Sequence, residues 1–193
     1  MRTNSICIYV GTRGSGKTHF VKNLIDDFPQ PKTLIVDILD NPEWHNMKTY
    51  NHPEWELRTV PIMPLDKVQL HKTGLYRIFS SDIEQLEFLI DQYVRNTSLI
   101  IEDCSRWYNS KLTKVQKRYL LNSKQTNCDI HLFFHTLASV PPDLIRYGDF
   151  LTIFKTGESF YDKKKYYLPA FEKAFNTVFK SNDRYINRTI RLQ

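Results

Sequence analysis

The chain has 193 residues, enough to bury one sizeable core and few for two, so we expect a single folded domain. Its three cysteines, Cys7, Cys104 and Cys128, have no Cys-x-x-Cys spacing, which argues against a disulfide framework or a zinc knuckle and favours a reducing, cytosolic compartment. An apolar run starts almost at Met1, and none approaches the roughly 18 residues of a membrane span, so neither a signal peptide nor a transmembrane segment is expected.

The first motif is a glycine-rich loop at residues 11–18, which reads GTRGSGKT. It lies between an apolar run at residues 6–10, expected as a strand, and a helical pattern that starts near residue 20. Only a backbone almost free of Cβ atoms can wrap its N–H groups around a phosphate, and the amino-terminal end of the following helix adds positive charge. The residues predicted to bind a nucleotide are Gly11, Thr12, Arg13, Gly14, Ser15, Gly16, Lys17, Thr18 and His19.

Two residues of this loop have predicted chemical roles. Lys17 is expected to reach the β- and γ-phosphate oxygens, and the hydroxyl of Thr18 is expected to bind Mg²⁺. The predicted ligands of the chain are therefore ATP and Mg²⁺.

Strand and helix patterns alternate after the loop. Strands are expected at residues 33–37, 75–79 and 98–101. A capping box that runs from Ser81 to Glu84 predicts the start of a helix, whose apolar residues fall on one face and would pack on a sheet.

Two carboxylates, Glu102 and Asp103, directly follow the strand at residues 98–101. They would lie at the carboxyl edge of the sheet, where a nucleotide binds. Hydrolysis needs one carboxylate to hold Mg²⁺, usually through water, and another to orient or deprotonate the attacking water. By their order Glu102 takes the metal position and Asp103 the water position. The opposite order of Asp and Glu is commoner, so the division of roles stays open.

The remaining elements complete an α/β pattern. A helix is expected from about residue 113 to 127, and strands at residues 130–134 and 150–154, the latter being the last strand expected. Strands that alternate with helices are typical of a parallel, doubly wound sheet. The predicted fold is an α/β P-loop NTPase fold of the RecA/ASCE type, a three-layer sandwich with a mainly parallel central sheet.

We divide the chain into an ATPase core at residues 1–160, with an irregular insertion at residues 41–73, and a C-terminal extension at residues 161–193. The last fifth of the chain is basic, and aromatic residues lie between its charges, a mixture that suits a nucleic-acid surface. Phe171, Phe175 and Phe179 are spaced as on one helix face, so the extension could equally be packed on or next to the core.

Over roughly residues 5–155 these motifs resemble the FtsK/HerA superfamily of P-loop ATPases. The resemblance is greatest to viral and phage DNA-packaging ATPases, which often carry a basic residue where this loop has Arg13, and zonula occludens toxin-like ATPases look like near relatives. In this superfamily the strand here at residues 129–134 ends in a polar sensor of the γ-phosphate, usually glutamine. This sequence has His135 there, Thr136 if the alignment shifts by one residue, or the apolar Leu137 if it shifts by two. A neutral histidine can donate one hydrogen bond as glutamine does.

The resemblance also implies a homo-oligomeric ring, in which a neighbouring copy supplies a basic residue to the γ-phosphate. An ordinary solvated surface would explain each basic residue equally well. The residues considered for this role are Arg106, Lys117, Arg118, Lys124 and Arg146.

The predicted function is that of an ATP-hydrolysing motor that translocates DNA, most similar to a viral genome-packaging ATPase. The resemblance implies backbone contacts to DNA without sequence specificity, a capsid or portal vertex as partner, and the host cytoplasm or the virion as location. One alternative is a zonula occludens toxin-like or mobile-element ATPase for assembly or DNA transfer. A nucleoside or nucleotide kinase is the alternative from another class, against which the two adjacent carboxylates and the basic C-terminus argue.

Overall fold

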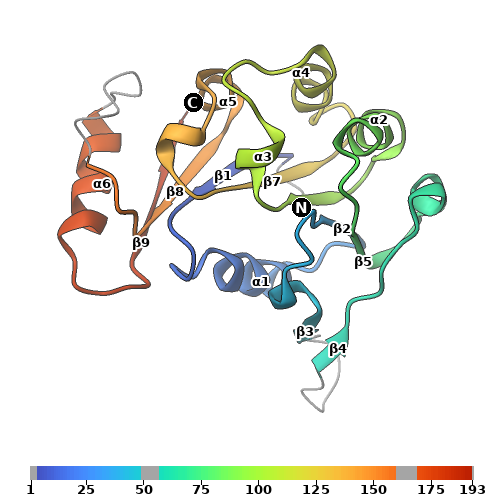
Figure 1. The fold of residues 1–193 in the computed structure, drawn as a ribbon, viewed down its shortest axis with the longest axis horizontal. Coiled ribbons are helices and arrows are strands. Elements are labelled where there is room, and N and C mark those ends of the chain that lie inside the picture. Colours follow the sequence, from blue (N-terminus) through green and yellow to red (C-terminus); the bar gives the residue numbers. More distant parts are fainter. Residues whose placement is uncertain (1–3, 49–56, 160–168, 193) are drawn as a thin grey trace.

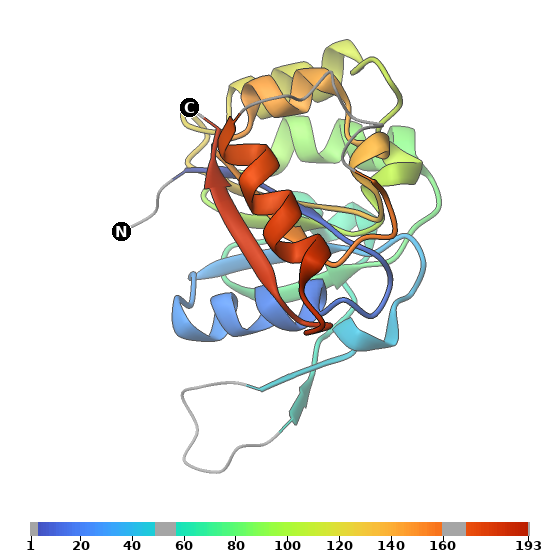
Figure 2. The ribbon, with the colours of Figure 1, turned by 90° about the vertical axis from the view of Figure 1, so that its left-hand side faces the viewer.

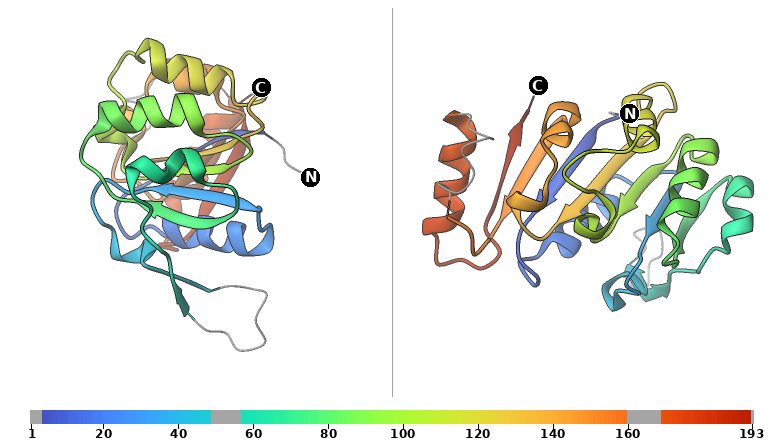
Figure 3. Two further views of the ribbon diagram at one scale, coloured as in Figure 1. Left: turned by 90° about the vertical axis from the view of Figure 1, so that its right-hand side faces the viewer. Right: turned by 45° about the horizontal axis from the view of Figure 1, so that its top comes forward.

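The computed structural model describes residues 4–48, 57–159 and 169–192, and a seven-stranded sheet lies at its centre. The strands are β1 (Ile6–Val10), β2 (Lys32–Val36), β5 (Gly74–Ile78), β6 (Ser98–Ile101), β7 (Asp129–Phe134), β8 (Phe150–Phe154) and β9 (Asn187–Arg191). Their order is β5-β2-β6-β7-β1-β8-β9, as the right-hand view of Figure 3 shows. All neighbouring strands are parallel except β8 and β9.

Helices cover both faces of this sheet (Figure 1). One face carries α1 (Lys17–Asp27), and the other carries α2 (Ile83–Tyr93), α3 (Cys104–Trp107), α4 (Lys114–Leu121) and α5 (Pro142–Tyr147). The predicted three-layer α/β fold with a mainly parallel sheet is therefore confirmed. No helix among the described residues combines the length and hydropathy that crossing a membrane requires.

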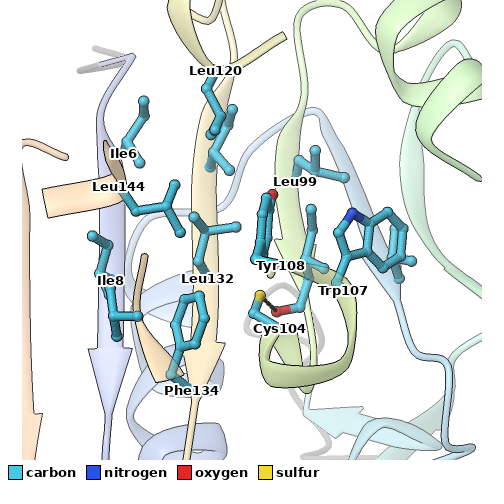
Figure 4. Close-up of a cluster of buried hydrophobic side chains, with 14 of the residues drawn as sticks. Ile6, Ile8, Leu99, Cys104, Trp107, Tyr108, Leu120, Leu132, Phe134 and Leu144 are labelled. Atoms are coloured by element: carbon cyan, nitrogen blue, oxygen red, sulfur yellow. Dashed lines mark hydrogen bonds between the residues drawn. The ribbon is translucent and has the colours of Figure 1, made fainter. Parts of the chain in front are cut away.

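The central strands contribute side chains to an apolar core on each face, which is why β1, β6 and β8 read as nearly continuous apolar runs. Figure 4 shows the core beneath α2 to α5, where Ile8 and Phe134 lie near Leu132 and Leu144. The core on the α1 face contains Tyr9, Val21, Ile35, Trp44, Ile100 and Phe133.

Two predicted helix boundaries are corrected. The predicted capping box at Ser81 is wrong by one residue, because Asp82 caps α2 and its side chain accepts a hydrogen bond from Gln85 N at 3.0 Å. The helix predicted to reach residue 127 ends at Leu121. Beyond it the chain continues as turns: Ser123 N donates to Leu120 O, three residues back, at 3.2 Å, and Asn127 adopts the left-handed conformation with φ of 54°.

The segment expected as an irregular insertion contains regular structure in its described part. It includes 3-10 helices at Pro42–Trp44 and Leu65–Leu70, and an antiparallel pair of strands, β3 (Asn46–Lys48) and β4 (Leu57–Thr59). Residues 49–56, within the same segment, lie outside the described residues.

A strand after residue 154 was not expected, and β9 corrects that prediction. It pairs with β8 at the sheet edge, and α6 (Pro169–Lys180) lies beside it in Figure 2. Phe171 and Phe175 of α6 are buried, whereas Phe179 is half exposed. The sequence of β9, NRTIR, is mostly polar because edge strands face solvent, so it lacks the apolar pattern of a buried strand. Residues 160–168 of the extension lie outside the described residues.

Candidate active site

The glycine-rich loop connects β1 to α1 and makes close backbone contacts. Gly14 and Gly16 have φ angles of 74° and 92°, in the left-handed region that glycine adopts without strain. A Cβ atom on Gly11 would lie 2.6 Å from both Phe154 Cβ and Ser15 Oγ, so this position has no room for a side chain. Ser15 Oγ is buried and forms no hydrogen bond within the described residues, which leaves it available to a ligand.

Lys17 is buried at the first turn of α1. Its Nζ donates hydrogen bonds to Gly11 O at 2.6 Å and Thr12 O at 3.1 Å. Burial lowers the pKa of Lys17 to about 8, and the charges of Glu102 and Asp103 oppose this shift. The ammonium group is thus held against carbonyl oxygens of its own loop, and phosphate oxygens would replace them as acceptors.

The structure also places Thr12, Arg13 and His19 of the predicted nucleotide set. Thr12 N and Thr12 Oγ1 both donate to Lys155 O, at 2.9 and 3.1 Å, which joins the loop to the end of β8. Arg13 and His19 are exposed, and the His19 ring lies 3.2 Å from Asn23 Nδ2 on the surface of α1.

Glu102 follows β6 and contacts two other elements. Its Oε1 accepts hydrogen bonds from Thr18 Oγ1 at 3.2 Å and from Trp44 Nε1 at 2.6 Å. Burial raises the pKa of Glu102, while the hydrogen bond from Trp44 and the charge of Lys17 oppose the shift. A hydroxyl and a carboxylate oxygen are therefore adjacent at the start of α1.

These two oxygens fit a magnesium ion. Mg²⁺ prefers oxygen ligands, keeps several of its waters, and is commonly bound by one or two side chains together with substrate phosphates. Thr18 and Glu102 match that pattern. Within the described parts of the chain, no cluster of three or more His, Cys, Asp or Glu side chains could hold a metal ion.

Asp103 and His135 face each other from neighbouring strand ends. Asp103 Oδ1 lies 3.4 Å from His135 Nε2, and Asp103 Oδ2 lies 3.2 Å from Arg106 Nε. Asp103 is buried and adopts the left-handed conformation, with φ of 48°, whereas His135 is half exposed. Partial burial, followed by the charge of Lys17, lowers the pKa of His135. His135 is therefore neutral at pH 7 and could donate a hydrogen bond.

The strand order explains why these groups meet. β7, which ends before His135, lies between β1, which leads into the loop, and β6, which leads into Glu102 and Asp103. Because the three strands are parallel, their carboxyl ends share one edge of the sheet.

The five basic residues considered for a role in a neighbouring copy all have acidic partners in their own chain. Arg106 is paired with a residue of the acidic pair itself, whereas the partners of the others lie on α2, on α5 and just before β8. Arg106 pairs with Asp103, Lys117 with Asp143 at 2.9 Å, Arg118 with Asp91, Lys124 with Asp149 at 3.8 Å and Arg146 with Asp143 at 3.9 Å.

Two contacts to this site were not expected from the sequence. Trp44, in the segment expected to be irregular, donates a hydrogen bond to Glu102. A single tryptophan in a sequence gives no local signal for a contact of this kind. Arg184 Nε donates to Gly14 O at 3.1 Å across 170 positions of sequence, and no spacing could have indicated that contact.

The fold matches solved structures along the whole chain. The genome-packaging NTPase B204 of Sulfolobus turreted icosahedral virus 2, in complex with ATP-γS, superposes with a TM-score of 0.70 at 16% identity, covering 100% of this chain and 94% of that one. B204 of Sulfolobus turreted icosahedral virus, a DNA-packaging ATPase, gives a TM-score of 0.61 at 13% identity, with coverage of 100% and 94%. The chain therefore has the fold of these NTPases, as predicted.

A third match is weaker. The N-terminal domain of zonular occludens toxin from Neisseria meningitidis gives a TM-score of 0.48 at 13% identity, covering 79% of this chain and 78% of that one, and adds nothing to the fold assignment. No protein-family model and no curated protein sequence matches the chain.

Proposed function

We propose that this chain is a Mg²⁺-dependent ATPase that translocates DNA, of the kind that packages viral genomes. One observation carries the proposal: Lys17, the Thr18–Glu102 contact and the Asp103–His135 contact converge at one edge of the sheet. The full-length similarity of fold to a viral genome-packaging NTPase that was solved with an ATP analogue supports it.

In the proposed reaction, water attacks the γ-phosphate in line with the leaving group. Asp103 orients and deprotonates this water, and His135 donates a hydrogen bond to the γ-phosphate. Lys17 neutralises negative charge that develops on the β- and γ-phosphate oxygens. Mg²⁺, held through Thr18 and Glu102, would supply further positive charge at the same oxygens.

Assembly and partners follow from the same proposal. The chain forms a homo-oligomeric ring, and a neighbouring copy contributes a basic side chain to the γ-phosphate. DNA passes through the ring by contacts to its phosphates, at a capsid or portal vertex in the host cytoplasm.

ATP hydrolysis with and without double-stranded DNA, at low and moderate salt, tests the proposal. The wild type should hydrolyse ATP faster with DNA, and Lys17→Ala should lose the activity. Lys111→Ala, which changes an exposed lysine, is the matched control. Transfer of phosphate to a nucleoside monophosphate, with no response to DNA at any protein concentration, would show a kinase instead.

A further inference from the structure

The turn at residues 181–186, between α6 and β9, lies against the glycine-rich loop. Besides its hydrogen bond to Gly14 O, Arg184 places Nη2 2.5 Å from where a Cβ atom on Gly14 would be. Tyr185 Cδ1 lies 3.2 Å from the corresponding position on Gly16. Because Gly14 and Gly16 have no Cβ atom, this turn can lie close to the loop. The same two glycines also give the loop its left-handed φ angles.

Lys155 fixes the turn relative to the loop. Its carbonyl oxygen accepts the hydrogen bonds from Thr12, while its Nζ donates to Val178 O at 3.1 Å, Phe179 O at 2.9 Å and Ser181 O. A positive charge at the carboxyl end of α6 also interacts favourably with the helix dipole. One residue thus holds both the phosphate-binding loop and the turn that approaches it.

The turn has its own internal hydrogen bonds. Tyr185 N donates to Asp183 Oδ1 at 2.9 Å, and Asp183 N donates to Ser181 Oγ at 3.1 Å. Directly after the turn, Asn187 pairs with Phe154 in the sheet. Tyr185 nevertheless remains 63% exposed beside the loop. An aromatic ring therefore lies beside the loop and outside the core.

The turn and the hydrolytic residues lie on opposite sides of β1. Glu102, Asp103 and His135 come from β6 and β7, whereas the turn leads into β9, beyond β8 (Figure 3). In a nucleotide whose β-phosphate lies in the loop, the γ-phosphate points toward the hydrolytic residues. The base, at the opposite end of the nucleotide, would then extend to the other side of β1, where Tyr185 lies.

We propose that Tyr185 stacks on the base of the bound nucleotide and that Arg184 is a positioning residue that fastens the turn to the loop. The inference rests on the nucleotide site of the proposed function. Stacking contributes binding energy with any base, because every base has a π face. The site should therefore discriminate poorly between ATP and GTP.

Binding of ATP and of inorganic tripolyphosphate, which has no base, tests the role of Tyr185. Tyr185→Ala should weaken ATP binding about tenfold or more and leave tripolyphosphate binding unchanged. Tyr185→Phe, which keeps the ring, should bind ATP as the wild type does. Tyr93→Ala, which removes an exposed tyrosine on α2, is the matched control. Arg184→Ala should weaken ATP binding in the same selective way, because it releases the turn.

The possible outcomes separate the two proposals. Equal ATP affinity in Tyr185→Ala and the wild type overturns the base-stacking role, and so does an equal loss of ATP and tripolyphosphate at an unchanged melting temperature. If Tyr185→Ala fails to fold, a Tyr185→Leu variant that binds ATP as the wild type does overturns it equally. A wild type that binds neither ligand overturns the proposed function, and this inference with it.

Discussion

The side chain of Lys17 is buried, and this burial lowers its pKa. Its pKa of about 8 in the folded chain lies below the ordinary value of 10.5. Between these values the unfolded chain binds more protons than the folded one, so Lys17 makes the folded state more stable as pH rises through this window. The binding of phosphate should respond in the opposite direction.

We expect the affinity for ATP to fall as the pH rises above about 8, because the neutral amine attracts phosphate less. Bound phosphate raises the pKa of Lys17, so kcat should fall at a higher pH than kcat/KM does. Titrations of ATP binding against pH check this. Lys17→Arg, which keeps its charge throughout, should bind ATP with an affinity that does not change over the same range. A constant wild-type affinity well above pH 8 would contradict the prediction.

The two carboxylates should separate into two roles when each loses its charge. Asp103→Asn should lower kcat by about 10²- to 10⁴-fold at saturating Mg²⁺, because the attacking water loses its base. Glu102→Gln should instead raise the Mg²⁺ concentration needed for half-maximal hydrolysis. Steady-state rates over a series of Mg²⁺ concentrations measure both effects. The reverse pattern would exchange the two assignments.

At the scale of elements, the short 3-10 helix at Pro42–Trp44 reaches the site through one tryptophan. Trp44 is fully buried and donates a hydrogen bond to Glu102 from the α1 face of the sheet. That bond opposes the rise in the pKa of Glu102 that burial causes.

Trp44→Phe removes this donor, so we expect the pKa of Glu102 to rise further and the acidic limb of the kcat/KM profile to move to higher pH. The control is Trp107→Phe, because Trp107 is also buried and donates no hydrogen bond to Glu102. Rates measured between pH 5 and pH 8 check both variants. An acidic limb that moves equally in both would indicate a general loss of packing.

An ion pair joins β5 to the end of β2 near the carboxyl edge of the sheet. Arg77 of β5 donates to Asp37, just beyond β2, at 3.1 Å, and both side chains are almost fully buried. Arg77→Leu would leave the Asp37 charge buried without its partner, so we expect the free energy of unfolding to fall by about 3–5 kcal/mol at pH 7.

Burial raises the pKa of Asp37, and losing the arginine would raise it further, so this loss should shrink as pH falls and the carboxyl is protonated. Urea denaturation at neutral and acidic pH measures the difference. The double variant Asp37→Asn, Arg77→Leu should lose less stability than Arg77→Leu alone. Equal losses in the single and double variants would show that the buried charge is not the cause.

For the whole molecule, the C-terminal segment is part of the folded body. α6 contributes Phe171 and Phe175 to the core, and β9 completes the sheet, so deleting the segment would expose apolar surface. Charge substitutions on its exposed surface are therefore the sharper test of DNA binding. Arg188 and Arg191 of β9 are both exposed.

Arg188→Gln with Arg191→Gln should weaken DNA binding and reduce the slope of log K against log salt by about 1.8, because each lost phosphate contact releases about 0.9 fewer counterions. Fluorescence anisotropy with a DNA duplex over a salt series measures the slope. Lys67→Gln with Lys72→Gln removes the same charge from a distant exposed surface and should leave it unchanged. Equal slopes in the wild type and the arginine variant would exclude β9 from the DNA contact.

The elements predicted best are those whose signal is local. The apolar runs at β1, β6 and β8 predicted buried strands within a residue of their bounds, because a strand buried on both faces must be apolar throughout. β9 was missed because a polar edge strand has no such requirement. The end of α4 was missed because the residues after Leu121 continue as hydrogen-bonded turns, whose composition resembles that of a helix.

By itself the sequence located the glycine-rich loop, since Gly11, Gly14 and Gly16 lie close together and mark a backbone that turns sharply or approaches other groups closely. It also placed two carboxylates at a strand end. Only the tertiary structure decided that Trp44 bonds one of them and that Arg184 and Tyr185 lie over the loop. Those contacts depend on strand order and edge pairing, which bring distant residues together without leaving a local pattern.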